Sequence, residues 1–305
     1  MSRLDGQVAL VTGASSGLGR ATATALARAG ATTALLARTA SDLEQAVEAL
    51  GADGHRALAV ACDLADADGL ERAVARVHQE LGPVRVLVNA AGSDAPGPVT
   101  QLRVADWDRV MAINLRAVFL LSRLVLPGMA DAGQGTIVNV SSVAGRRGWA
   151  NASAYCASKF ALTGFTQALN AETREHGVRT CVVYPGAMAT HWGTWQPEDR
   201  RTDDGEPADP ETSLPPETVA DFIAWLATAP FALVSTRRPS PRFANRDGRR
   251  HEAPVRSCLD RSSDTRHPDL AQTQLPPSAR LVWDARGGDG VRPLASEHDN
   301  PIASL

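Results

Sequence analysis

Short aliphatic and β-branched runs alternate with longer Ala- and Leu-rich segments between residue 7 and about residue 235. This alternation predicts repeated strand–helix–strand units, which form a parallel sheet. The expected strands are 7–12, 32–37, 56–61, 84–88, 135–140 and 178–184, and the expected helices are 17–29, 41–50, 67–81, 104–130, 153–176 and 216–228. Runs such as VALVT and VRVLVN are apolar throughout, which is typical of strands covered on both faces. The sequence therefore predicts an α/β fold, a doubly wound parallel sheet (Rossmann fold) with helices on both faces.

The composition changes after about Pro239, where arginine, aspartate and proline replace the aliphatic clusters. Such a segment buries too little apolar surface to offset the entropy that is lost on ordering. We therefore predict a Rossmann-type catalytic domain over residues 1–240 and an atypical C-terminal extension over 241–305 that is irregular or disordered. A short strand at 280–284 remains possible in this extension.

The overall charge and the cysteine pattern argue against several kinds of protein. A formal net charge of -3 gives no general attraction to nucleic acid or to an anionic membrane surface, so we expect neither partner. The four cysteines are far apart and lack the spacing of a metal site or a disulfide framework. The apolar run near the N-terminus is too short for a signal sequence or a membrane span. We expect a cytoplasmic protein without a metal site.

The stretch TGASSGLG, residues 12–19, lies where the first expected strand ends and the first expected helix begins. Glycines there allow backbone angles closed to other residues, and they let main-chain N–H groups approach a pyrophosphate at the positive end of the helix. The stretch predicts a dinucleotide site, although glycine-rich turns of this kind also serve as plain structural turns. Its expected cofactor contacts are Gly13, Ser15, Ser16, Gly17, Leu18 and Gly19.

The second expected strand ends in ALLARTA, and this ending bears on the choice of nicotinamide cofactor. A carboxylate there would accept hydrogen bonds from the adenosine ribose, but Ala37 and Arg38 stand in its place. Because a guanidinium binds a 2′-phosphate through paired hydrogen bonds, NADP(H) is favoured over NAD(H). The alternative is that Arg38 is a solvated loop residue. Asp63 is expected either to accept from the adenine amino group or to cap the helix at 67–81.

The chain contains one lysine, Lys159, and two tyrosines, Tyr155 and Tyr184. Tyr155 and Lys159 are four residues apart in a helical segment, so their side chains lie on one face about a turn apart. A phenol has an ordinary pKa of about 10, and lowering it by about three pH units takes roughly 4 kcal/mol. Lys159 and a positive nicotinamide ring would together lower it. The alternative is a packed tyrosine with a lysine chain running past it.

With these residues, the chain resembles the short-chain dehydrogenase/reductase family in its common single-domain form over about residues 5–235. The resemblance rests on motifs in the family's order and spacing: TGASSGLG at 12–19, Asp63, NAAG at 89–92, Asn114 in MAINL, VSS at 140–142, YCASK at 155–159 and YPGAMAT at 184–190. It implies that Ser142 orients the substrate oxygen and that Tyr155 protonates or deprotonates it. It also implies that Lys159 lowers the Tyr155 pKa and holds the nicotinamide ribose, while Asn114 anchors a water that relays protons.

The resemblance further implies cofactor contacts outside the glycine turn, at Asp63, Leu64, Asn89, Ala90, Gly92, Tyr155, Lys159, Pro185, Gly186, Met188 and Thr190. Several of these residues have a structural alternative. The serines at 141–142 could cap or finish a strand, Asn114 could satisfy buried backbone groups, and the NAAG turn could simply end a strand. The segment after Thr190 is long, polar and proline-bearing, which is typical of a substrate lid. Four residues could line an apolar pocket there: Met188, His191, Trp192 and Trp195.

The expected function is an NADP(H)-dependent oxidoreductase that interconverts a carbonyl and an alcohol on a small, largely apolar substrate. A 3-oxoacyl ketoreductase and a broad carbonyl reductase are not separable at this level. Two other classes remain as rivals, a catalytically silent dinucleotide-binding regulatory protein and a Rossmann-type methyltransferase. In the family, the helices corresponding to 104–130 and 153–176 pack into a subunit contact, so the resemblance implies a homodimer or a homotetramer. The resemblance also implies a seventh strand, which residues 231–241 could form.

Overall fold

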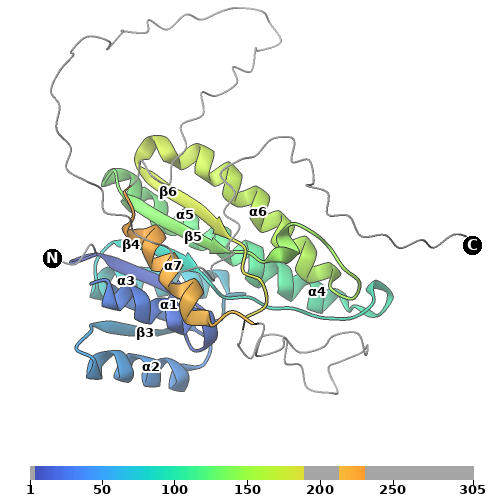
Figure 1. Ribbon diagram of the computed structural model, residues 1–305, viewed down its shortest axis with the longest axis horizontal. Helices are drawn as coiled ribbons and strands as arrows, with labels where there is room; N and C mark the ends of the chain where they lie inside the picture. Colours follow the sequence, from blue (N-terminus) through green and yellow to red (C-terminus); the bar gives the residue numbers. More distant parts are fainter. Residues whose placement is uncertain (1–3, 189–212, 231–305) are drawn as a thin grey trace, which may run out of the picture.

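The structure is a computed structural model that describes residues 4–188 and 213–230. Within these residues, six parallel strands form one sheet in the order β3-β2-β1-β4-β5-β6 (Figure 1). The strands are β1 (Val8–Thr12), β2 (Thr32–Ala37), β3 (Ala57–Ala61), β4 (Val84–Asn89), β5 (Gly135–Val140) and β6 (Val178–Val183). The chain runs outward from β1 to β3 and then crosses back to β4. The carboxyl ends of β1 and β4 therefore meet where a doubly wound sheet opens a crevice. The predicted fold class is confirmed.

Helices cover both faces of the sheet. One face carries α1 (Gly17–Arg28), α2 (Ala40–Ala52) and α7 (Pro216–Thr228). The other face carries α3 (Ala67–Glu80), α5 (Ala117–Asp131) and α6 (Ser153–Thr173). The shorter elements are η1 (Val99–Gln101), α4 (Val104–Met111), the π-helical turn η2 (Ala112–Arg116), η3 (Val143–Gly145) and η4 (Arg174–His176).

Alternate residues of each strand supply the two layers of the core. In β1, Ala9 and Val11 pack with α1 and α7, whereas Val8 and Leu10 pack with α3 and α5. All four side chains are buried. Because successive side chains point to opposite faces of a strand, an apolar run such as VALVT serves both layers at once. Full burial of a Val or Leu side chain contributes about 1.5–3 kcal/mol.

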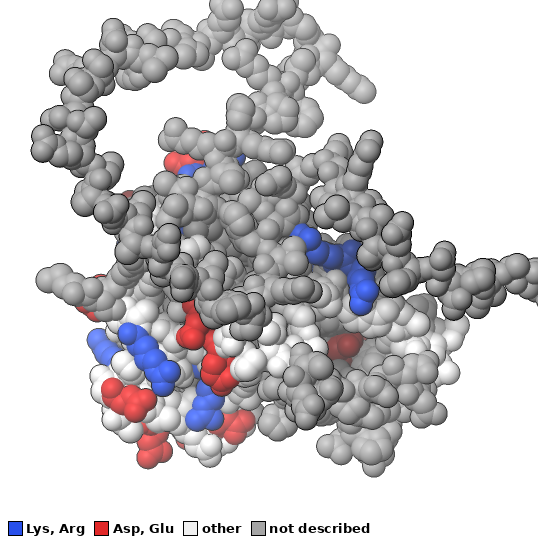
Figure 2. All heavy atoms as spheres, viewed as in Figure 1, with Lys and Arg blue, Asp and Glu red and all other residues white. Residues whose placement is uncertain are grey.

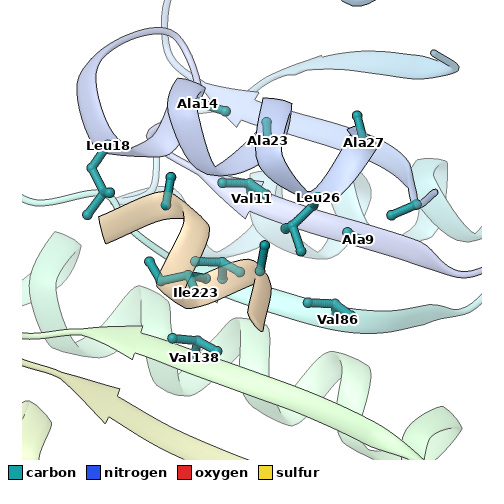
Figure 3. Close-up of a cluster of buried hydrophobic side chains, with 14 of the residues drawn as sticks. Ala9, Val11, Ala14, Leu18, Ala23, Leu26, Ala27, Val86, Val138 and Ile223 are labelled. Carbon is teal, nitrogen blue, oxygen red and sulfur yellow. The ribbon is translucent and has the colours of Figure 1, made fainter. Parts of the chain in front are cut away.

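The helix α7 covers the middle of the sheet on the α1 face. Figure 3 shows Ile223 of α7 lying over the strands that carry Val86 and Val138, with α1 beside it. Ile223 is fully buried. The buried Arg179 of β6 donates hydrogen bonds to the carbonyl oxygens of Leu226 and Ala229, the second at 2.7 Å. These bonds satisfy carbonyl groups at the end of the helix and attach it to β6.

The predicted helix at 104–130 differs from the structure in one respect, because the turn η2 divides it into α4 and α5. The whole run Val104–Asp131 is long and apolar enough to span a membrane by length and composition alone, with a mean hydropathy of 1.6 over 18 residues. In this fold, Leu121, Val125 and Met129 lie in the core against the sheet. Packing against the sheet therefore accounts for much of its apolar character.

The other predicted bounds agree with the structure within a few residues. Several expectations concern residues outside 4–188 and 213–230: Thr190, His191, Trp192, Trp195, the strands at 231–241 and 280–284, and the extension at 241–305. The division at residue 240 stays a prediction.

Figure 2 shows acidic and basic side chains intermixed over the described residues at its lower left. The described surface there has no area of a single charge sign.

Candidate active site

A cleft of about 380 Å³ opens at the carboxyl ends of the strands. Most of the predicted site residues line it: Gly13, Ser15, Ser16, Gly17, Leu18, Gly19, Arg38, Asp63, Leu64, Ala90, Gly92, Tyr155, Lys159 and Met188. Five others do not line it: Asn89, Asn114, Ser142, Pro185 and Gly186. The fold thus brings the glycine turn and the tyrosine–lysine pair to one cleft, although more than 130 residues separate them in the sequence.

The glycine turn is packed against the segment that follows β4. Gly13 has a φ of 69°, and a Cβ atom added to it would lie 2.9 Å from the Cα atom of Ala91. A Cβ atom on Gly19 would collide with the carbonyl oxygen of Gly13. The Thr12 hydroxyl oxygen accepts hydrogen bonds from the N–H groups of Ala90 and Ala91, each at 3.1 Å. Glycine at 13 and 19 therefore lets the two strand ends approach each other closely.

The N-terminus of α1 fits the pyrophosphate of a dinucleotide. Ser16 is the N-cap residue, but its side chain makes no capping hydrogen bond, and the first turn contains no acidic residue. The first main-chain N–H groups of the helix therefore have no side-chain acceptor, and the positive end of the helix dipole adds to their attraction for an anion. Among the described residues, no group of three His, Cys, Asp or Glu side chains could hold a metal ion.

One end of the cleft lies beside β2 and the segment after β3, where the adenosine of a dinucleotide was predicted to bind. Ala37, Arg38 and Thr39 line it, and Arg38 is exposed. Asp63 accepts a hydrogen bond from the N–H group of Ala65 at 3.0 Å and forms an ion pair with Arg109 at 3.2 Å. The bond from Ala65, with help from Arg109 and Arg38, holds the Asp63 pKa below its ordinary value.

The alternative role for Asp63, as the cap of the helix at 67–81, is wrong. The N-cap residue of α3 is Asp66, whose side chain accepts from the N–H group of Gly69 at 3.0 Å. Asp63 lies three residues earlier and faces the cleft, where its carboxylate is oriented by Ala65 and Arg109. The arginine was not predicted, because 46 residues separate it from Asp63 in the sequence.

Three candidate catalytic side chains come from the residue before η3, two residues after β5 ends, and from the first turns of α6. Ser142 forms a hydrogen bond with the Tyr155 side chain, and its Oγ atom also accepts from the N–H group of Ala144 at 3.2 Å. The Lys159 Nζ atom donates to the carbonyl oxygen of Val140 at 2.8 Å and lies 5.6 Å from the centre of the Tyr155 ring. Lys159 is buried, with 3% of its surface exposed.

Burial dominates the pKa values of this pair. Removal from water raises the Tyr155 pKa to about 12, with the hydrogen bond from Ser142 opposing the rise and Asp94 adding to it. Burial likewise lowers the Lys159 pKa to about 8, against the opposing effect of Asp94. The expectation that Lys159 lowers the Tyr155 pKa is therefore not met by the protein alone. The prediction combined Lys159 with a bound nicotinamide ring and left out the opposing effect of desolvation.

Asn114 occupies the π-helical turn between α4 and α5 and is 1% exposed. Its Oδ1 atom accepts from the N–H group of Ser93 at 2.7 Å. Its Nδ2 atom donates to the carbonyl oxygen of Ser93 at 2.8 Å and to the hydroxyl of Ser158 at 2.9 Å. An amide has two N–H donors, and these two bonds use both of them within the protein. The side chain ties the segment after β4 to α6, beside Tyr155.

Asn89 lies in the core rather than in the cleft. It is 2% exposed and donates to the Oδ1 atom of Asn139 at 2.8 Å, and Asn139 donates in turn to Thr166 at 2.9 Å. This chain of buried bonds joins β4, β5 and α6 behind the site.

The cleft also contains residues that were not predicted: Ala37, Thr39, Cys62, Ala91, Ser93, Ile113, Val140 and Ser141. Each is adjacent in sequence to a predicted residue except Val140, which lies two residues before Ser142.

This fold and cleft define a protein of the dinucleotide-binding α/β class, with a serine, a tyrosine and a lysine gathered at one end of the cleft. The model of the family described as short chain dehydrogenase matches residues 7–201. The chain belongs to the short-chain dehydrogenase/reductase family, as its motifs suggested.

Several relatives and a solved structure resemble the chain closely. It is 41% identical to the D-threitol dehydrogenase of Mycolicibacterium smegmatis, over 63% of this chain and 74% of the relative. It is 32% identical to the 3-oxoacyl-[acyl-carrier-protein] reductase FabG of Vibrio cholerae, over 76% of this chain and 94% of the relative. The crystal structure of a metagenomic short-chain oxidoreductase in complex with NADP matches with a TM-score of 0.65 and 36% identity, over 75% of this chain and 94% of the other. These matches support an oxidoreductase that acts on alcohol or carbonyl groups.

Proposed function

We propose that the protein is an NADP(H)-dependent oxidoreductase that interconverts a ketone or aldehyde and an alcohol, with Tyr155 as the general acid and base. The observation that carries the proposal is the position of Tyr155 and Lys159 in the cleft that also contains the N-terminus of α1. A dinucleotide bound at that helix end would extend along the cleft toward the tyrosine. Family membership supports the reaction class.

In reduction, the substrate oxygen would accept hydrogen bonds from Ser142 and Tyr155, whose side chains are already bonded to each other. The bound cofactor supplies the hydride. Tyr155 then donates its proton to the oxygen. Because the Tyr155 pKa is about 12, the phenol is protonated at neutral pH and ready to act as an acid. Binding and orientation by the protein accelerate the step.

In oxidation, Tyr155 must instead accept a proton. Lowering its pKa from about 12 to about 7 requires roughly 7 kcal/mol, at about 1.4 kcal/mol for each pH unit. Lys159 would contribute to this, together with the positive charge of an oxidised nicotinamide. One N–H donor of Lys159 is used by Val140, which leaves two donors of the ammonium for the ribose hydroxyls.

Asn114 would anchor a proton-relaying water near Lys159. Both of its amide N–H groups are used by Ser93 and Ser158, so the water would have to donate to an oxygen atom of Asn114. The side chain then has a second task, which is to fix the π-helical turn in place.

The preference for NADP(H) rests on the end of β2. Ala37 and Arg38 line the cleft where NAD-binding proteins place a carboxylate, so a 2′-phosphate would meet a guanidinium rather than a negative charge. The structural relative in complex with NADP agrees with this choice.

The decisive experiment follows the absorbance of NADPH with a panel of ketones, aldehydes and acyl thioesters. We expect consumption with at least one of them and at least about a 100-fold loss of turnover in Tyr155→Phe, since positioned acid–base catalysis contributes that much. NADPH binding, followed by fluorescence, should persist in the variant. Turnover that survives in Tyr155→Phe would remove Tyr155 from the mechanism. Binding of NADPH without turnover of any compound would favour a silent regulatory protein.

We further propose that the protein assembles as a homodimer or homotetramer through α5 and α6. Phe119 of α5 is 45% exposed, and its ring meets that of Phe165 of α6 edge-on at 6.3 Å between centres. The two rings line a hollow of about 520 Å³ between the helices. A partly exposed aromatic pair beside a hollow is typical of a surface that a second copy covers. A cytoplasmic location stays a prediction.

A further inference from the structure

The segment between β4 and η1 holds a carboxylate beside the candidate catalytic residues. At one end of this segment, Asn114 binds both the N–H group and the carbonyl group of Ser93. At the other end, the N–H group of Gly97 donates to the carbonyl oxygen of Asn151 at 2.8 Å. Asn151 has a φ of 63° and lies two residues before α6 begins. Asp94 lies between these attachments, so its backbone is held at both sides.

Only one oxygen atom of the Asp94 carboxylate accepts a hydrogen bond from the residues that the structure describes. Its Oδ1 atom accepts from the N–H group of Ala95 at 2.7 Å. Its Oδ2 atom has no hydrogen-bond partner in the part of the chain that the structure describes, and it is not among the fully buried polar atoms. A ligand that reaches Oδ2 would therefore meet an open acceptor.

Asp94 also interacts electrostatically with the two groups that the proposed reaction uses. The negative charge raises the pKa of both Tyr155 and Lys159, and Lys159 in turn opposes the rise of the Asp94 pKa to about 6, which burial causes. Geometry also places this segment beside the pair. Ser93, which precedes Asp94, lines the cleft together with Tyr155 and Lys159. Its partner Asn114 bonds to Ser158, whose hydroxyl donates to the carbonyl oxygen of Tyr155 at 2.7 Å. At pH 7 and above, Asp94 is mainly ionised and accepts hydrogen bonds only.

We propose that Asp94 is a specificity-determining residue that accepts a hydrogen bond from a second hydroxyl group on the substrate. The site then prefers hydroxyketones and the matching diols over plain ketones and monoalcohols. This inference rests on the proposed oxidoreductase function and replaces the expectation of a largely apolar substrate. An apolar group placed against a half-buried carboxylate would displace its water without replacing the hydrogen bonds, which opposes binding. A neutral hydroxyl suits the site better than an ammonium, because Lys159 already supplies a positive charge.

The test compares matched ketones that differ by one hydroxyl group: 2-butanone with 3-hydroxy-2-butanone, cyclohexanone with 2-hydroxycyclohexanone, and acetophenone with 2-hydroxyacetophenone. The readout is the ratio of kcat/KM for the two members of a pair, measured at pH 7.5 with NADPH. A hydrogen bond to a charged group predicts a ratio of roughly 10 to 100 in favour of the hydroxyketone for the wild-type protein. Asp94→Asn keeps an acceptor for the N–H group of Ala95 and should lower the ratio, and Asp94→Ala should bring it near one.

The matched control is Asp131→Asn, which removes the same charge at the exposed C-terminal end of α5. This residue lies just before β5 begins, at the amino ends of the strands and away from the cleft at their carboxyl ends. It should leave the ratio at the wild-type value. A wild-type ratio near one for every pair, or an equal ratio in wild type and Asp94→Ala, would overturn the inference while leaving the oxidoreductase function intact. Failure to reduce any ketone in the larger panel would instead contradict the proposed function. Binding of NADPH shows that each variant is folded.

Discussion

Replacing Lys159 by methionine should stabilise the protein while it removes activity. Lys159 is the single lysine of the chain, and its side chain is buried against the Tyr155 ring and the carbonyl oxygen of Val140. Methionine has a similar length and no charge. The variant therefore removes a buried ammonium without leaving a large cavity.

The pKa values give the size of the effect. Burial lowers the Lys159 pKa from 10.5 to about 8, so the folded protein binds this proton less tightly than the unfolded chain does. Burying the amine costs nothing in stability above pH 10.5, where it is neutral in both states, and the cost reaches its full size as the pH falls through about 8. The resulting cost is about 3 kcal/mol at pH 7 and about 1 kcal/mol at pH 9.5. Loss of the hydrogen bond to Val140 offsets about 1 kcal/mol of the gain.

The assay is urea unfolding followed by tryptophan fluorescence at pH 7 and pH 9.5. Lys159→Met should raise the free energy of unfolding by about 2 kcal/mol at pH 7, and the gain should shrink by roughly 2 kcal/mol at pH 9.5. The matched control is Lys159→Arg. Neither variant has a group at residue 159 that titrates between pH 7 and pH 9.5, so the difference between their free energies of unfolding should stay constant. A gain for Lys159→Met that does not change with pH would refute the reasoning.

Two further changes test the cofactor and the assembly. Arg38→Asp should reverse the preference for NADPH over NADH, because it places a carboxylate where a 2′-phosphate would bind. The ratio of kcat/KM for the two cofactors measures this preference. An unchanged ratio would exclude Arg38 from recognition of the 2′-phosphate. The double variant Phe119→Asp, Phe165→Asp should yield monomers, because each charge would be buried in the subunit contact. Light scattering measures the mass, and a wild-type protein that is already monomeric would contradict the proposed assembly.

The sequence predicted the sheet well because its strands are short apolar runs separated by helical segments of regular period. The strand at 135–140 and the helix at 216–228 match the structure to the residue. The π-helical turn at Asn114 was missed because its cause is not local. Asn114 binds Ser93 and Ser158, which lie 21 and 44 residues away. No pattern within one helix carries that information.

The site was predicted less completely than the fold. Motifs located the glycine turn and the tyrosine–lysine pair, since their chemistry depends on short spacings. Asp94 was missed although it is the second residue after NAAG, because its importance depends on bonds at Ser93 and Gly97 that hold it near Tyr155. The rise of the Tyr155 pKa in the protein without a bound cofactor was not predicted, because burial is a property of the whole fold and cannot be read from a neighbouring residue.

The position of α7 has a consequence for how the chain is made. This helix is the last element that the structure describes, yet Ile223 packs over Val86 and Val138 in the middle of the sheet. A ribosome delivers the N-terminal residues first, so the layer over these strands stays incomplete until residues 216–228 emerge. Until then, the nascent protein exposes an apolar sheet face, and a chaperone that shields this face would protect the chain during synthesis.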